Sequence, residues 1–201
     1  SGLNIVALTD HNTAKNCPAF FQAAKKQGII PVGGMEVTTS EDIHAVCLFD
    51  TLEGAMEFDR EIDKKRIKIK NKIEVFGHQD IMDGDDNVIG EEEYFLPVAT
   101  TVSLEDLPQM VKEFSGVAYP AHIDRNSNGL IHILGTFPET PYFSAFELRD
   151  KVSLTSTNQE VEKVVREEVE GAIDNSFNVL RTRIDRFGVV QPNIQKLSQT
   201  G

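Results

Sequence analysis

The sequence predicts an α/β fold for residues 1–150, followed by a long helix and one further strand in residues 151–201. Near the start of the chain, short apolar runs of strand type flank an amphipathic helical pattern. The links between these segments are short, which is typical of a βαβ unit in a parallel sheet. After residue 151 the pattern changes to a single long amphipathic stretch. A composition of 40% hydrophobic and 26% charged residues is that of a globular protein.

The first elements follow from apolar runs and their glycine boundaries. Residues 4–8 form a short strand, 14–27 an amphipathic helix that ends at Gly28, and 29–37 a second strand. A third strand is predicted at 43–49, and a long helical pattern covers 51–72.

The later elements are separated by an acid-rich stretch. Residues 80–93 read as a solvated turn, because the segment from Asp83 to Asn87 lacks the glycine and the second helix of an EF-hand. Ser103 caps a helix that runs to Gly116, and strands are predicted at 117–122 and 143–148. In the tail, apolar positions spaced by three and four predict a helix from about Glu160 to Gly188 and an edge strand at 189–194.

The charge limits the classes of partner. The formal net charge is −12, and residues 1–150 carry 13 Lys and Arg against 25 Asp and Glu, so the field of the molecule repels nucleic acid. A basic run at 64–72 is interpreted as a solvated helix face, with a phosphate-attracting patch as the alternative.

Cysteine use and hydropathy indicate an intracellular protein. Cys17 and Cys47 have no metal-site spacing and are expected to be buried thiols, and no apolar run approaches the length of a membrane span. A cytoplasmic location is therefore expected. Both ends of the sequence are expected to be cut from something longer.

Side chains of ligand type are expected at the ends of four strands. They are His11, Glu36, His44 and His122. In parallel α/β folds sites form beyond the carboxyl ends of strands, and three imidazoles with one carboxylate can hold zinc, manganese or iron. Each histidine could instead be a hydrogen-bonded loop residue, and Asp10 could be the N-cap of the helix that follows it.

His78 and His132 are expected to be structural. His132 falls in Gly129–Leu134, which reads as a short apolar helix.

Four separated motifs resemble the PHP (polymerase and histidinol phosphatase) family of metal-dependent phosphoesterases. They are ALTDHNT, GIIPVGGMEVTT, DIHAVCLF and GVAYPAHIDR, in that order within residues 1–150. The resemblance implies a distorted (βα)7-type barrel with two or three divalent ions that hydrolyses a small phosphate ester through a metal-activated hydroxide.

The resemblance also implies roles for single residues. His11, His44 and His122 correspond to imidazole ligands and Glu36 to a bridging carboxylate. Asp10 corresponds to a supporting acid, and Arg125 is the candidate for gripping the substrate phosphate.

The chain departs from the family pattern at both ends of this region. The first strand with its HxH motif and the late strand with Asp-x-His are not found, so we expect an incomplete barrel with exposed edges and weak or no activity. A second chain could complete such a barrel.

The tail resembles a different family. The run DNSFNVLRTRIDRFGVVQPNIQ, residues 174–195, is similar to a periplasmic segment of the SecD/SecDF protein-export factor, in which it is structural. The sequence therefore divides into a phosphoesterase domain at 1–150 and a SecD-like segment at 151–201. Three hypotheses remain: a phosphoesterase, a non-enzymatic segment of an export factor located in the cell envelope, and a composite chain of two unrelated fragments.

Overall fold

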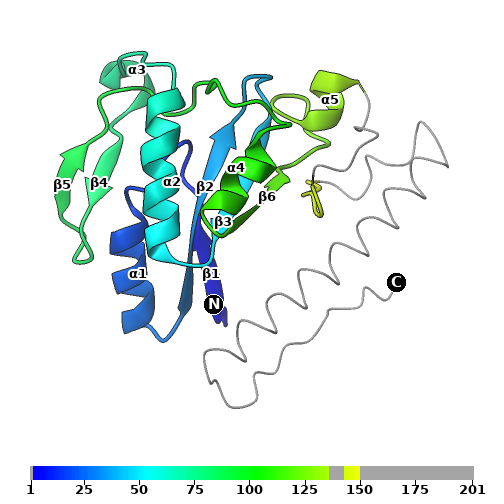
Figure 1. Cartoon of the computed structure of the whole chain (residues 1–201). Helices are drawn as coiled ribbons and strands as arrows, with labels where there is room; N and C mark the ends of the chain where they lie inside the picture. The colour runs from blue at the N-terminus through cyan, green and yellow to red at the C-terminus, as the bar shows by residue number, and fades with distance from the viewer. Residues whose placement is uncertain (1, 136–142, 150–201) are drawn as a thin grey trace, which may run out of the picture.

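A four-stranded mixed sheet forms the centre of the molecule. The computed structural model describes residues 2–135 and 143–149. The sheet has the order β1-β2-β3-β6 (Figure 1). Its strands are β1 (Ile5–Leu8), β2 (Ile30–Thr38), β3 (His44–Phe49) and β6 (Gly116–Pro120).

The first three elements form the predicted βαβ unit. The helix α1 (Cys17–Lys26) connects β1 to β2, and these two strands are parallel. The strand β3 is antiparallel to both β2 and β6, so the expectation of a parallel sheet throughout is wrong. The link at 39–43 is too short for the crossover that parallel strands require, and it closes a hairpin instead.

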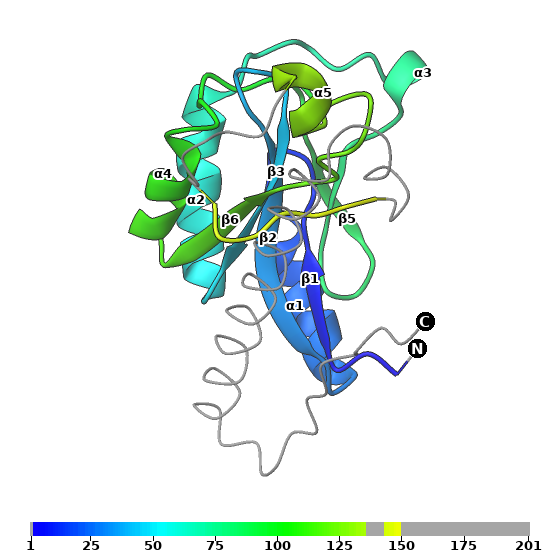
Figure 2. The same ribbon diagram turned by 90° about the vertical axis from the view of Figure 1, so that its right-hand side faces the viewer.

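Helices α2 (Leu52–Lys65) and α4 (Leu107–Glu113) cover one face of this sheet (Figures 1 and 2). Successive side chains of a strand point to opposite faces. Residues at odd positions of β2 and β3 therefore pack against the helices, while Glu36 and His44 point to the other face. The main core contains Met35, Val37, Ala45, Cys47, Phe49, Ala55, Phe58, Ile62, Leu107 and Val111.

A small hairpin and two short helices complete the described structure. These elements are α3 (Ile73–Phe76), β4 (Asp80–Met82), β5 (Val88–Glu91) and α5 (Leu130–Leu134). The sequence interpretation of 80–93 as a solvated turn holds only for the residues between β4 and β5. There, Oδ1 of Asp83 accepts hydrogen bonds from the backbone N–H groups of Asp85 and Asn87, at 2.9 and 3.0 Å.

Three predicted helices are shorter than expected, among them α1, which was predicted at 14–27, and one predicted strand is not formed. The pattern at 51–72 is helical only to Lys65, because Arg66 is extended. The helix predicted from Ser103 begins at Leu107, and Ser103 caps the preceding turn by accepting a hydrogen bond from the N–H of Asp106. Residues 143–148 form no strand, although Glu147 bonds through its backbone to Pro120 and Ile123.

Both cysteines are free and buried, as expected. Burial raises the pKa of Cys17 to about 11, so its thiol stays protonated at neutral pH. The helix and strand predicted in 151–201 lie outside the described residues.

The α/β class is thus confirmed. The described residues form an open sheet and no closed barrel. Among them, no helix combines the length and the apolar character needed to cross a bilayer.

Candidate metal centre

Four segments bring the predicted ligands to one edge and one face of the sheet. Because β3 runs antiparallel, its first residue, His44, lies at the edge where β2 and β6 end. His122 follows β6 by two residues, and His11 forms an isolated parallel bridge with Glu36. Glu36 lies within β2 and not at its end, which corrects the expected position.

The three imidazoles surround the carboxylate of Glu36. Its Oε2 lies 3.3 Å from Nδ1 of His11, and its Oε1 lies 3.4 Å from Nδ1 of His44 and 3.3 Å from Nε2 of His122. The ring of His44 contacts the rings of His11 and His122, with centroids 5.0 and 5.2 Å apart. All three predicted imidazole ligands therefore contact the predicted carboxylate ligand.

The protonation states suit metal binding. Burial lowers the pKa of His11, and the neighbouring His44 and His122 lower it further, against the opposing effect of Glu36 and Asp10. Burial raises the pKa of Glu36, but the three histidines outweigh this effect, and the pKa lies below its ordinary value. A neutral imidazole and an ionised carboxylate are the forms that bind a cation.

The ring nitrogens test whether these residues fit a metal. Nδ1 of His11 and of His44 is buried and faces the carboxylate of Glu36, at 3.3 and 3.4 Å, whereas the buried Nδ1 of His122 has no hydrogen-bond partner among the described residues. Buried polar atoms without partners are costly and call for an explanation. One donor set of His11, Glu36 and His44 has ligand atoms within 4.8 Å of one another. Nitrogen and carboxylate donors in this number suit zinc, manganese or iron, so the residues fit the expected ions.

Backbone contacts hold the ligand segments rigidly. Asn12, next to His11, is 1% exposed and accepts a 2.9 Å hydrogen bond from the N–H of Thr38, while its Nδ2 donates to the carbonyl groups of Leu96 and Val98. His122 has a φ of 31°, a strained value for a residue with a side chain. Such strain persists only where the surroundings enforce it, and it is concentrated at functional sites.

A cavity of about 330 Å³ opens beside His11. Its polar lining includes Asp10, His11 and Lys15, and its apolar wall includes Phe76 and Phe95. The two phenylalanine rings stack with centroids 4.2 Å apart. The cavity is large enough for a small ligand adjacent to the candidate ions.

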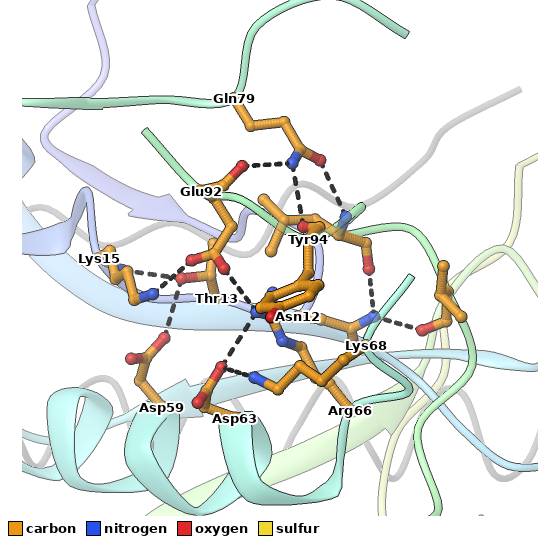
Figure 3. A network of polar contacts seen from close by, with 12 residues as sticks. Asn12, Thr13, Lys15, Asp59, Asp63, Arg66, Lys68, Gln79, Glu92 and Tyr94 are labelled. Carbon is orange, nitrogen blue, oxygen red and sulfur yellow. Dashed lines mark hydrogen bonds and ion pairs between the residues drawn. The ribbon is translucent and has the colours of Figure 1, made fainter. Parts of the chain in front are cut away.

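A network of charged residues reaches this cavity through Lys15 and Glu92, which line it. Glu92 lies between Lys15 and Arg66 (Figure 3), with its Oε1 2.7 Å from Nη2 of Arg66. Arg66 also contacts Asp63, as does Lys68. The interpretation of the basic run as a solvated helix face is therefore wrong for Arg66, whose side chain is 3% exposed because it reaches inward to Glu92.

The two residues predicted to assist catalysis have different positions. Asp10 lines the cavity, and its carbonyl oxygen accepts a 3.0 Å hydrogen bond from the N–H of Glu36. It is not the cap of α1, because Asn16 occupies that position. Arg125 lies in the turn after His122, where its N–H donates to the carbonyl oxygen of His122, and it is not among the residues that line the cavity.

The sequence interpretation missed Asp59, which organises the loop before α1. Its Oδ1 accepts hydrogen bonds from Thr13 Oγ1 and from the N–H of Ala14, at 2.9 and 2.7 Å. The spacing of apolar residues in the sequence could have revealed it, because Asp59 falls on the apolar face of α2 together with Ala55, Phe58 and Ile62. A carboxylate on such a face has to find a buried partner.

Comparisons with known proteins give three findings. The sequence profile of the PHP domain matches residues 1–180. A structure from Bifidobacterium adolescentis, described as a metal-dependent phosphoesterase, is 19% identical with a TM-score of 0.40, and the match covers 62% of this chain and 58% of that one. The SecD subunit of the protein translocase of Rhodothermus marinus is 27% identical over 115 residues, which span half of this chain but only 18% of SecD.

The family profile extends over most of the chain and includes all four motifs with His11, Glu36, His44 and His122. The chain belongs to the PHP domain family.

Proposed function

We propose that this protein is a metal-dependent phosphoesterase whose divalent ions are bound by His11, Glu36, His44 and His122. The observation that carries the proposal is the convergence of three imidazoles, one buried and two half-buried, on one ionised carboxylate, at nitrogen–oxygen distances of 3.3–3.4 Å. Membership of a metal-dependent hydrolase family supports it. Zinc, manganese and iron remain the candidate metals, in a centre of two or three ions.

Each residue has a proposed part in the reaction. When bound, the ions would lower the pKa of a water molecule and neutralise the phosphate oxygens. Glu36 contacts all three histidines and would bind ions through both of its oxygens. The cavity beside His11 would hold the organic part of a small phosphate ester.

Asp10 and Arg125 have proposed positioning and binding roles. Asp10 holds the backbone of Glu36 and electrostatically favours the protonated form of His11, which opposes the effect of burial. Arg125 would bind the phosphate through its guanidinium fork, on the turn that also carries His122.

Metal content and hydrolysis of p-nitrophenyl phosphate test the proposal on the full chain. We expect His11→Ala and His122→Ala each to lower bound manganese or zinc and to lower turnover by about a hundredfold or more. His132→Ala is the matched control, because His132 is an exposed residue of α5 and is not one of the proposed ligands. A wild-type protein with background metal content after exposure to manganese and zinc would contradict the proposal.

The similarity to SecD leaves a second hypothesis for the tail. A segment at 151–201 that serves an export factor would bind unfolded polypeptide without hydrolysing phosphate esters. Those residues lie outside the described structure, and the PHP profile extends past residue 150 to residue 180. The division at residue 150 therefore stays a prediction. To test it, the binding of an unfolded secretory polypeptide would be compared between the full chain and a chain that ends at residue 150.

A further inference from the structure

A second group of metal-binding side chains lies on the β4–β5 hairpin, apart from the ligands described above. It consists of His78, Asp80 and Glu91, whose ligand atoms all lie within 4.8 Å of one another. Nδ1 of His78 is 3.0 Å from Oε1 of Glu91. All three residues are exposed to solvent.

The hairpin register places these side chains on one face. Asp80 and Glu91 are directly paired in the antiparallel ladder, which brings the Cβ atoms of such a pair to about 5 Å. His78 precedes Asp80, the first residue of β4, by two residues, and its contact with Glu91 places it on the same side. Gln79, between them, points the opposite way and bonds to the carbonyl oxygens of Glu92 and Tyr94.

The charges on this face are not balanced by the protein. Two carboxylates directly opposite each other on antiparallel strands repel one another. Within the described residues, no lysine or arginine forms an ion pair with Asp80 or Glu91, and the one ion-pair partner of Glu91 there is His78. Other acids on the same molecule do have such partners, as Glu93 has in Lys70 and Asp85 has in Lys26.

We propose that His78, Asp80 and Glu91 form a second divalent-metal site. One imidazole and two carboxylates are ligands that zinc accepts, and solvent water would complete a four-coordinate shell. Tetrahedral zinc with bonds of about 2.0–2.2 Å needs donor atoms somewhat closer together than 4.8 Å. Small rotamer changes of exposed side chains provide this contraction.

The site adjoins the cavity beside His11, because Asp80 is also one of the residues that line that cavity. It does not depend on the proposed phosphoesterase activity, since none of its three donors is a proposed ligand of the first centre. An ion here would offset the negative charge of the cavity rim, where an anionic substrate would enter.

Zinc titration of the metal-free full chain, followed by calorimetry, tests this proposal. We expect His78→Ala to remove about one zinc equivalent, or to weaken that equivalent about tenfold or more, while the remaining equivalents bind as in the wild type. His78 is 62% exposed, so its truncation leaves no cavity in the core. His132→Ala, and Glu93→Gln on the adjoining strand end, should leave the titration unchanged.

A second measurement does not depend on a variant. Zinc should shift the imidazole NMR signals of His78 but not those of His132. The proposal is overturned if His78→Ala and the wild type give the same stoichiometry and affinities, or if the signals of His78 do not move when zinc is added. Glu36→Gln separates the two proposals, because it should weaken the first centre and leave the His78 response intact.

Discussion

Glu92 is a buried carboxylate whose replacement should cost measurable stability. It has a 7% exposed side chain and holds both Lys15 and the buried Arg66. Glu92→Gln would leave the guanidinium of Arg66 with Asp63 as its remaining acidic partner. We expect a loss of about 3 kcal/mol in the free energy of unfolding, measured by urea denaturation at pH 7. The exposed Glu93, which lies 3.6 Å from Lys70, supplies the control, and Glu93→Gln should cost less than about 1 kcal/mol.

The contribution of Glu92 to the free energy of unfolding should depend on pH, and its pKa fixes the direction of that dependence. Burial raises the pKa of Glu92, but hydrogen bonds from Lys15 and Arg66 outweigh it, so the pKa lies below its ordinary value of 4.5. A depressed pKa in the folded state adds stability above the pKa of the unfolded state, and this stability is lost as the pH falls through the folded-state pKa. The difference between wild type and Glu92→Gln should therefore be complete at pH 7 and shrink below about pH 4.5. An equal difference at pH 7 and pH 3 would show that Glu92 acts through packing alone.

The residues of the proposed metal centre could be predicted from the sequence, but the charged network could not. His11, Glu36, His44 and His122 fall in motifs beside or within apolar strands, and the structure brings all four together. Arg66 and Glu92 are distant in sequence, and the segment between them has no periodic pattern of apolar residues that would predict their contact. No spacing rule relates two such positions.

At the scale of elements, the β2–β3 hairpin depends on close backbone contact. A Cβ on Gly34 would lie 2.7 Å from the carbonyl oxygen of Cys47 and 2.9 Å from side-chain atoms of Leu48 and Thr9. We expect Gly34→Ala to cost about 1–3 kcal/mol of unfolding free energy and to weaken metal binding, because Glu36 is two residues further along the same strand. Circular dichroism during guanidinium unfolding measures the first effect.

The hairpin β4–β5 supplies the matched control for this substitution. Gly90 also lies in a strand, and a Cβ there would meet only Ile81, at 3.6 Å and beyond. Gly90→Ala should be neutral or stabilising by about 0.5 kcal/mol, since it restricts the unfolded chain without a clash. Equal losses for both variants would mean that the loss at Gly34 reflects the glycine backbone and not the contact with Cys47.

Elements were predicted best where periodicity and boundary residues agree. The unit from β1 to β2 was found because apolar runs flank an amphipathic helix that Gly28 follows. The helical pattern at 51–72 continued past Lys65 in the sequence, but the chain extends there so that Arg66 can reach Glu92. The strands β4 and β5 are only three and four residues long, too short for an alternating pattern to be distinguished from a turn.

For the whole molecule, the position of the proposed metal centre depends on sheet order. The proposed centre uses residues beside or within β1, β2, β3 and β6, which is the complete order of the main sheet. All four proposed ligands come from this one chain, and the described residues lend no support to a second chain that completes the site. The order of the strands, unlike their positions, could not be predicted from the sequence, because β6 joins the sheet beside β3 only after the long connection between them.

Because bound ions would connect all four strands, metal binding should stabilise the entire fold. A ligand at a hundred times its dissociation constant adds about 2.7 kcal/mol to the folded state, provided that it does not bind the unfolded chain. For a chain of this size, this corresponds to a rise of about 5–10 °C in the unfolding temperature. Differential scanning fluorimetry with zinc or manganese, compared with EDTA, measures the rise. Glu36→Gln should abolish most of it, whereas His132→Ala should retain it, and an unfolding temperature that is the same with ions and with EDTA would contradict a centre that links the four strands.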